Sequence, residues 1–247
     1  MIHTDKTIKA KNELEKITGI PVKILSLDDF SKKFDAPYIT SYFGVYNRLE
    51  EEHIIGINLN KPNTNESTFV HECCHAIMNH LGYPKVDYMT YPSDGADFVS
   101  LLHRISSNLS SVIQHPKVYY MMENDFEIDM ENYFKGLLLQ KCERLKKSSK
   151  EFELEKQVFN IQQNIIDGME YFYYDDETRK TILSQLSITC PNSYNFLIGL
   201  KKAKYNFLEI KESKKSANDL LARIKKYGEK RTESKTLNNI WDRILIN

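Results

Sequence analysis

The pattern of apolar and polar residues changes character near residue 60 of this chain. Before that point, short runs rich in β-branched and aromatic residues predict three strands, and a polar turn joins the last two as a hairpin. Residues 4–18 have helical spacing and end at Gly19, and a second, shorter helix ends near Phe34. The expected strands are residues 22–27, 38–46 and 53–59.

After residue 60 the apolar spacing is helical throughout, and we expect no further strand. Residues 64–81 form the first expected helix, which ends at Gly82. Residues 95–114 form the next, and Pro116 is expected to stop it because proline cannot donate a backbone hydrogen bond. Further helical segments are expected at residues 129–147, 151–173, 177–187, 193–211, 218–227 and 237–245.

This order of elements predicts an α+β fold. A small core, in which a short sheet or hairpin lies beside the helix of residues 64–81, is followed by an all-helical C-terminal portion. We expect residues 1–145 to form the core domain and residues 146–247 a helical extension, with the lysine-rich stretch 146–150 as the seam.

The charge balance restricts the class of partner. The chain of 247 residues has 34 Lys and Arg against 34 Asp and Glu, so its formal net charge is zero. This balance argues against the broad positive surface of a nucleic-acid-binding protein or of a protein bound to an anionic membrane. The last fifty or so residues are locally basic, which we interpret as a solvated helical face; contact with nucleic acid or with a protein partner is the alternative.

No apolar run approaches the roughly 20 residues that span a bilayer, so we expect no membrane segment. The N-terminus is charged and lacks the apolar stretch of a secretory signal. We therefore expect a cytoplasmic protein in which all four cysteines are reduced thiols. Adjacent Cys73 and Cys74 are expected to pack in the core.

Residues 71–75 read His-Glu-Cys-Cys-His and match the pattern H-E-x-x-H. At about 100° per residue, His71 and His75 lie one turn apart on one helix face, so both imidazoles can bind one ion. Two neutral histidines suit Zn²⁺ and leave it Lewis-acidic, with a position for water. Glu72 lies on the neighbouring flank, where it can take a proton from that water as a general base. The mostly apolar flanks of this helix argue against an exposed helix that carries two histidines by chance.

Residues 68–76, Thr-Phe-Val-His-Glu-Cys-Cys-His-Ala, resemble the active-site helix of zincin metallopeptidases. A strand, a hairpin and then this helix are similar to the small α+β zinc peptidases of the ImmA/IrrE type. The resemblance covers about residues 20–120. It implies a zincin-like core that binds Zn²⁺, a thermolysin-like mechanism and a peptide or protein substrate. His71 and His75 would be metal ligands and Glu72 the catalytic residue.

The third ligand departs from the best-known zincin patterns. Metzincins continue as H-E-x-x-H-x-x-G-x-x-H, but this chain has Met78 and Leu81 at the positions of the glycine and the last histidine, so that branch is excluded. Gluzincins take a glutamate from a following helix, but none occurs between Glu72 and Glu123. The usual short gluzincin spacing therefore fails, and the family patterns leave the third ligand open.

The helix expected at residues 95–114 and the residues that flank it offer the best candidates for the third ligand. His103 lies about 140° from the centre of its apolar side, which predicts solvent exposure. His115 lies nearer the flank of that side, so we choose His115 as the third metal ligand. The alternatives are Asp94, Asp97 and Glu123.

These features together predict a zinc metallopeptidase of the cytoplasm. Residues 53–59 would be either the edge strand that holds an extended substrate or an interior strand. One alternative function is a catalytically inactive zinc-containing module whose helical extension binds a protein partner. The other is a metal-free regulatory or nucleic-acid-binding protein that uses the basic C-terminal helices.

Overall fold

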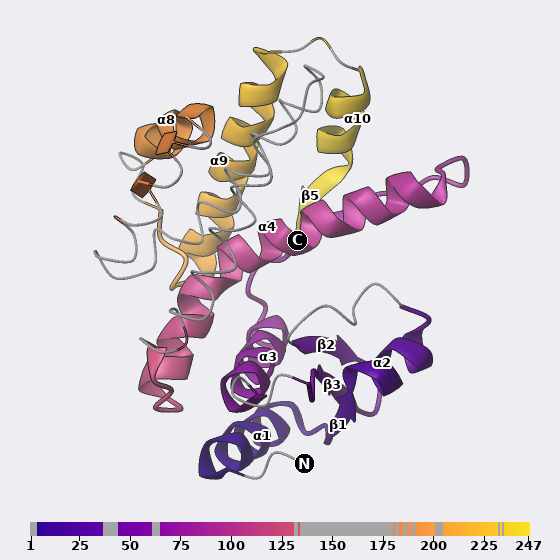
Figure 1. The fold of residues 1–247 in the computed structure, drawn as a ribbon, viewed down its shortest axis with the longest axis vertical. Coiled ribbons are helices and arrows are strands. Elements are labelled where there is room, and N and C mark those ends of the chain that lie inside the picture. Colours follow the sequence, from indigo (N-terminus) through magenta and orange to yellow (C-terminus); the bar gives the residue numbers. More distant parts are fainter. Residues whose placement is uncertain are drawn as a thin grey trace. The chain divides into compact units, whose positions relative to one another are not determined.

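The computed structural model describes residues 4–36, 44–60, 65–130, 133, 180, 183–184, 187–188, 191–200, 205–231, 233 and 235–247. The chain divides into two compact units (Figure 1). The first contains Met1–Gly82 and Lys117–Tyr133, and the second contains Tyr83–Pro116 and Phe134–Asn247. Each unit combines helices with a small sheet, so the fold class is α+β. The domain boundary expected between residues 145 and 146 lies outside the described residues.

A three-stranded sheet in the order β1-β3-β2 forms the centre of the first unit. β1 (Val22–Ser26) pairs in parallel with β3 (His53–Ile57), and β2 (Gly44–Arg48) pairs antiparallel with β3. The expected hairpin is confirmed, with Gly44 opposite Ile57. Every residue of β3 is buried, as in a central strand covered on both faces. Residues 53–57 are therefore an interior strand, and β2 lies at the edge.

Helices cover both faces of this sheet (Figure 1). On one face, α2 (Leu27–Phe34) buries Phe30 against Ile54 of β3. Successive strand residues point to opposite faces, so the adjacent strand residues His53 and Ile55 point to the other face. That face is covered by α1 (Asp5–Thr18) and α3 (Asn65–His80), which pack against each other. α1 ends at Gly19 as the sequence predicts, with a left-handed φ of 70° that glycine adopts at no steric cost.

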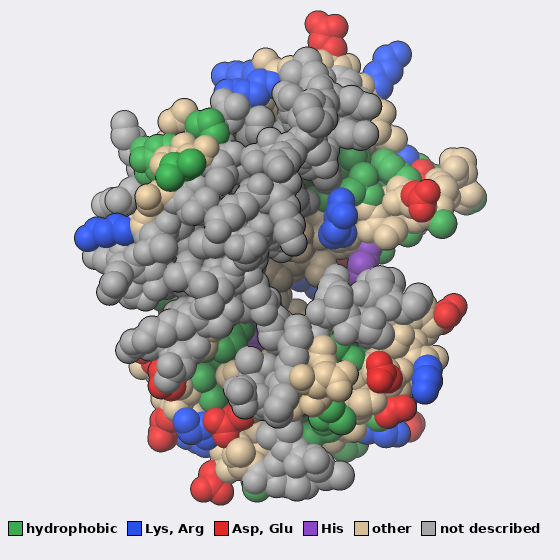
Figure 2. Space-filling view, in the orientation of Figure 1, with side chains coloured by type: hydrophobic (Ala, Val, Ile, Leu, Met, Phe, Trp, Pro, Cys, Tyr) green, Lys and Arg blue, Asp and Glu red, His purple; other side chains and the backbone are tan. Residues whose placement is uncertain are grey.

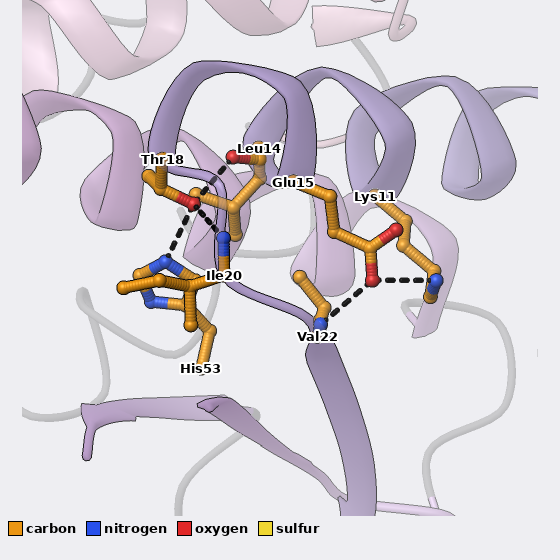
Figure 3. A network of polar contacts seen from close by, with 7 residues as sticks. All are labelled: Lys11, Leu14, Glu15, Thr18, Ile20, Val22 and His53. Carbon is orange, nitrogen blue, oxygen red and sulfur yellow. Dashed lines mark hydrogen bonds and ion pairs between the residues drawn. The ribbon is translucent and has the colours of Figure 1, made fainter. Parts of the chain in front are cut away.

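The buried His53 links β3 to α1 (Figure 3). Its Nε2 lies 3.0 Å from Thr18 Oγ1, and its Nδ1 lies 3.0 Å from Tyr46 Oη. The Thr18 hydroxyl donates its only proton to the Leu14 carbonyl at 2.8 Å, so its oxygen accepts from His53 Nε2–H. In the neutral imidazole, this leaves Nδ1 to accept from the Tyr46 hydroxyl. Burial and the positive Arg48 lower the pKa of His53 below its ordinary value.

We expect the first unit to lose stability as the pH falls below about 6.5. Because the pKa of His53 is lower in the folded state, the unfolded chain binds the proton more tightly. The stabilisation is therefore fully present above the unfolded pKa and is lost as the pH falls through the folded pKa. Urea unfolding followed by circular dichroism between about pH 5 and 7 measures this slope. In His53→Gln the slope should flatten, and an unchanged slope would assign it to other groups.

α4 (Ala96–Asn124) continues through Pro116, so the expectation that this proline ends the helix is wrong. Proline has no N–H for the Val112 carbonyl, which costs a helix about 3 kcal/mol. Packing beyond the proline offsets this cost, because apolar side chains of the next turns are buried. They are Val118, Tyr119, Met121 and Met122.

The second unit contains a two-stranded sheet that the apolar pattern did not predict. β4 (Val86–Tyr88) pairs antiparallel with β5 (Ile244–Ile246), so the expectation of no strand after residue 60 is wrong. Both strands are three residues long, too short to show alternation, and their pairing depends on contacts distant in the sequence.

Among the described residues of the second unit, three helices lie between α4 and β5. They are α8 (Pro191–Leu200), α9 (Ile210–Glu229) and α10 (Lys235–Arg243). The single helix expected at residues 193–211 is wrong, because residues 205–209 are not helical and α9 begins before residue 211. The helix expected at 151–173 lies outside the described residues, as do most residues of those expected at 129–147 and 177–187.

Two surface properties bear on possible partners. On the face drawn in Figure 2, acidic and basic side chains are interspersed among the described residues. This mixture agrees with the formal net charge of zero. Within the described part of the chain, no helix combines the length and apolar character needed to cross a bilayer.

Candidate metal centre

Two histidines of α3 bring their ring nitrogens together in the first unit. The Nε2 atoms of His71 and His75 lie 3.1 Å apart. In a tetrahedral zinc site with Zn–N bonds of about 2.0–2.1 Å, two ligand nitrogens are separated by about 3.3–3.4 Å. The one-turn spacing of these residues therefore produces a separation close to that of two imidazoles on one ion. His71 is 8% exposed, and His75 is partly buried.

His115 of α4 completes a group of three imidazoles. One ring nitrogen from each of His71, His75 and His115 lies within 4.8 Å of the others. The division between the units falls just after Pro116, inside the continuous helix α4, so His115 belongs to the same helix as Lys117–Asn124 of the first unit. These three residues are therefore close enough to hold a metal ion.

The other sequence candidates do not join this group among the described residues. Asp94 accepts from the Tyr91 backbone N–H at 2.6 Å and pairs with Arg243 at 3.0 Å. These two contacts, the N–H first, lower the pKa of Asp94. Asp97 and Glu123 are exposed on α4.

His103 is exposed on α4, as its angular position predicts. Its ring lies against that of Tyr88, with centroids 6.1 Å apart. An exposed histidine on the same helix as His115 provides a matched control for substitutions of the metal centre.

Burial lowers the pKa of His71 and raises the pKa of Glu72. Burial and the neighbouring His75 lower the pKa of His71 well below its ordinary value, so its imidazole is neutral at physiological pH. A metal ion requires this neutral form, because the ligand nitrogen must have a lone pair. Burial raises the pKa of Glu72 to about 8. A bound cation would oppose that shift by stabilising the carboxylate.

The side chain of Glu72 packs against the edge strand β2. A Cβ atom at Gly44 would lie 2.5 Å from Thr68 Cγ2 and 3.3 Å from Glu72 Oε1. Contacts under 3.0 Å require a shift of the neighbouring atoms, so glycine allows β2 to approach α3 this closely. The close approach brings the Glu72 carboxylate beside the edge of the sheet, an arrangement that the sequence pattern did not reveal.

Two tyrosine rings surround His71. The rings of Tyr119 and Tyr133 have centroids 6.0 Å and 6.1 Å from that of His71. Tyr133 Oη lies 3.1 Å from His71 Nδ1, the ring nitrogen that does not face His75. Burial raises the pKa of Tyr133, so its hydroxyl is neutral. Sequence reasoning missed this contact, because nothing in the local pattern connects residues so far apart.

The two cysteines between the histidines are buried free thiols. Burial raises the pKa of both Cys73 and Cys74 well above the ordinary thiol value. Thiolate is the form that binds zinc, so this environment disfavours metal binding by either sulfur. The prediction that Cys73 and Cys74 pack in the core is confirmed.

No protein-family model, curated protein or solved structure matches this chain. The zincin resemblance of residues 68–76 therefore stays a prediction. The grouping of His71, His75 and His115 is a property of the structure itself and does not depend on that resemblance. A functional interpretation consequently has to rest on the chemistry of these side chains.

Proposed function

We propose that this protein is a zinc-dependent hydrolase of peptide bonds. His71, His75 and His115 would bind the ion, and Glu72 would act as general base. The observation that carries the proposal is the grouping of three imidazole nitrogens within 4.8 Å, with Glu72 next to His71 on the same helix. Three neutral histidines are a donor set that suits a catalytic zinc ion and leaves one position open. A bound zinc ion supplies Lewis acidity, which promotes the attack of water on a carbonyl group.

The residues of the chain then perform the proton transfers. Glu72 accepts a proton from the attacking water on its carboxylate and donates that proton to the leaving amine. Burial raises its pKa to about 8 in the metal-free protein, and a bound cation would favour the ionised carboxylate that accepts the proton. With the ion bound, His71 and His75 would both be neutral ligands, and their Nε2 atoms lie 3.1 Å apart.

The edge strand supports a peptide as the substrate. Among the described strands, β2 pairs only with β3, along one of its two sides. An extended peptide can pair with such an edge through main-chain hydrogen bonds. Because Gly44 at the start of β2 lies against Glu72, a peptide on this edge would pass near the carboxylate. We therefore propose β2, next to the interior strand β3, as the strand with which a substrate would pair.

Metal removal tests the proposal. The protein is purified without a nickel column, its metal content is measured, and it is incubated with a proteome-derived peptide library whose new termini are identified by mass spectrometry. We expect a chelator to abolish cleavage and one equivalent of Zn²⁺ to restore it. If zinc-loaded protein cleaves no peptide, the peptidase activity is contradicted while the metal centre stands. If the chelated protein cleaves as fast as the zinc-loaded protein, the role of zinc is wrong.

A further inference from the structure

The two ring nitrogens of His71 face different partners. Its Nε2 lies 3.1 Å from Nε2 of His75, on the side of the three-histidine group. Its Nδ1 lies 3.1 Å from the hydroxyl oxygen of Tyr133. The two nitrogens lie on different sides of the imidazole ring. Tyr133 therefore contacts Nδ1 and leaves Nε2 available to bind a metal ion.

We propose that Tyr133 is a positioning residue of the metal centre: its hydroxyl oxygen accepts a hydrogen bond from His71 Nδ1–H and holds Nε2 toward the ion. The inference rests on the metal centre of the proposed function and is independent of the reaction catalysed there. It assigns a role to a residue outside the group of three histidines.

The proton inventory of the imidazole supports this role. A neutral imidazole carries one N–H, and a metal bound at Nε2 requires that proton to be at Nδ1. The opposite tautomer would direct a proton from Nε2 at His75, which lies 3.1 Å away, and would occupy the lone pair that the metal needs. His71 is only 8% exposed, so an Nδ1–H without a partner would be a poorly solvated donor. The Tyr133 oxygen provides the acceptor.

Packing holds the Tyr133 ring in place. Its centroid lies 6.0 Å from that of Tyr119, in an edge-to-face arrangement with the rings at 61°. Tyr119 itself lies one helical turn after His115 on α4. The backbone N–H of Tyr133 donates to the Asp129 carbonyl at 3.1 Å, the hydrogen bond of a helical turn. The ring packing and this backbone hydrogen bond therefore hold the Tyr133 hydroxyl in place.

Substitution of the hydroxyl alone tests the proposal. Tyr133→Phe keeps the ring and its packing against Tyr119 but removes Oη. We expect its affinity for Zn²⁺, measured by competition with a chromophoric chelator, to be about 10–100-fold lower than that of the wild type. The matched control is Tyr120→Phe, which removes an exposed tyrosine hydroxyl from α4 and should bind zinc with wild-type affinity. A Tyr133→Phe affinity within twofold of the wild type would overturn the inference.

Cobalt substitution gives a readout that altered packing does not reproduce. In the Co²⁺-loaded wild type, each histidine bound through Nε2 has an exchangeable Nδ1–H whose proton NMR signal is shifted by the paramagnetic ion. We expect the His71 proton to exchange slowly with water in the wild type and rapidly in Tyr133→Phe. Rapid exchange of every shifted proton in the wild type would overturn the inference even if the variant did not fold. A wild type that binds no metal would overturn both the inference and the proposed function, whereas metal binding without peptide cleavage would leave the inference intact.

Discussion

Replacing Glu72 with glutamine is expected to lower the rate of peptide hydrolysis by about 10²–10⁴-fold while leaving one zinc ion per chain. Glutamine has the size of glutamate but cannot accept the proton of the attacking water. The histidine ligands are unchanged, so the zinc content should stay the same while the rate of hydrolysis falls. Cleavage rates on a peptide selected from the library, with elemental analysis of the same samples, measure both. The matched control is Glu66→Gln, the same chemical change in the first turn of α3.

The pKa of Glu72 provides a check on the integrity of this variant. Burial raises the folded-state pKa from its ordinary 4.5 to about 8, so the unfolded carboxyl ionises more readily. In the metal-free protein, the folded state therefore loses relative stability as the pH rises from the unfolded pKa through the folded pKa. Metal-free Glu72→Gln should consequently be more stable than the wild type at about pH 8. A variant that lost both stability and activity would indicate a damaged fold and would not identify Glu72 as the base.

The parts of the first unit that the sequence predicted correctly are those with strong local signals. Thr4 forms a capping box at the start of α1, and Gly19 supplies the left-handed residue at its end. The helix that carries His71 and His75 was predicted because its periodicity and its end at Gly82 depend on neighbouring residues. Helical spacing then fixes how close the two imidazoles lie, so three of the four proposed site residues could be predicted from five consecutive residues.

Features that depend on distant contacts could not be predicted in this way. Pro116 has a strong local tendency to end a helix, but the buried side chains beyond it outweigh that tendency. β4 and β5 form only because Val86 and Ile246 meet across most of the chain. The hydroxyl of Tyr133 reaches His71 from 62 residues away. The local sequence pattern contains no information about these contacts, because each joins residues that are far apart in the chain.

The choice of His115 depended partly on a local signal and partly on a distant contact. Its place on the flank of an apolar helix face was visible in the sequence, but the distance between that helix and α3 was not. Asp94, Asp97 and Glu123 satisfied similar local criteria. The structure separates them, because Asp94 is occupied by Arg243 and the other two carboxylates are exposed.

Replacing His115 with alanine is expected to weaken zinc binding by more than the 10–100-fold loss typical of removing an outer partner. The substitution removes one of three imidazoles from the group, so the ion would keep only the two ligands of α3. Metal content measured after dialysis against a chelator of moderate affinity should fall from one zinc per chain to a small fraction. Cleavage of the library peptides should fall with it, because Glu72 alone does not activate water.

His103→Ala is the control for this substitution. It removes the same side chain from an exposed position of the same helix and should leave both zinc content and cleavage unchanged. Loss of zinc in both variants would mean that binding depends on the integrity of α4 and not on the imidazole of His115. Retention of zinc in His115→Ala, together with its loss in His75→Ala, would place the third ligand elsewhere in the chain. Loss in His115→Ala and His75→Ala but not in His103→Ala would identify one imidazole from each of two helices as ligands of the same ion.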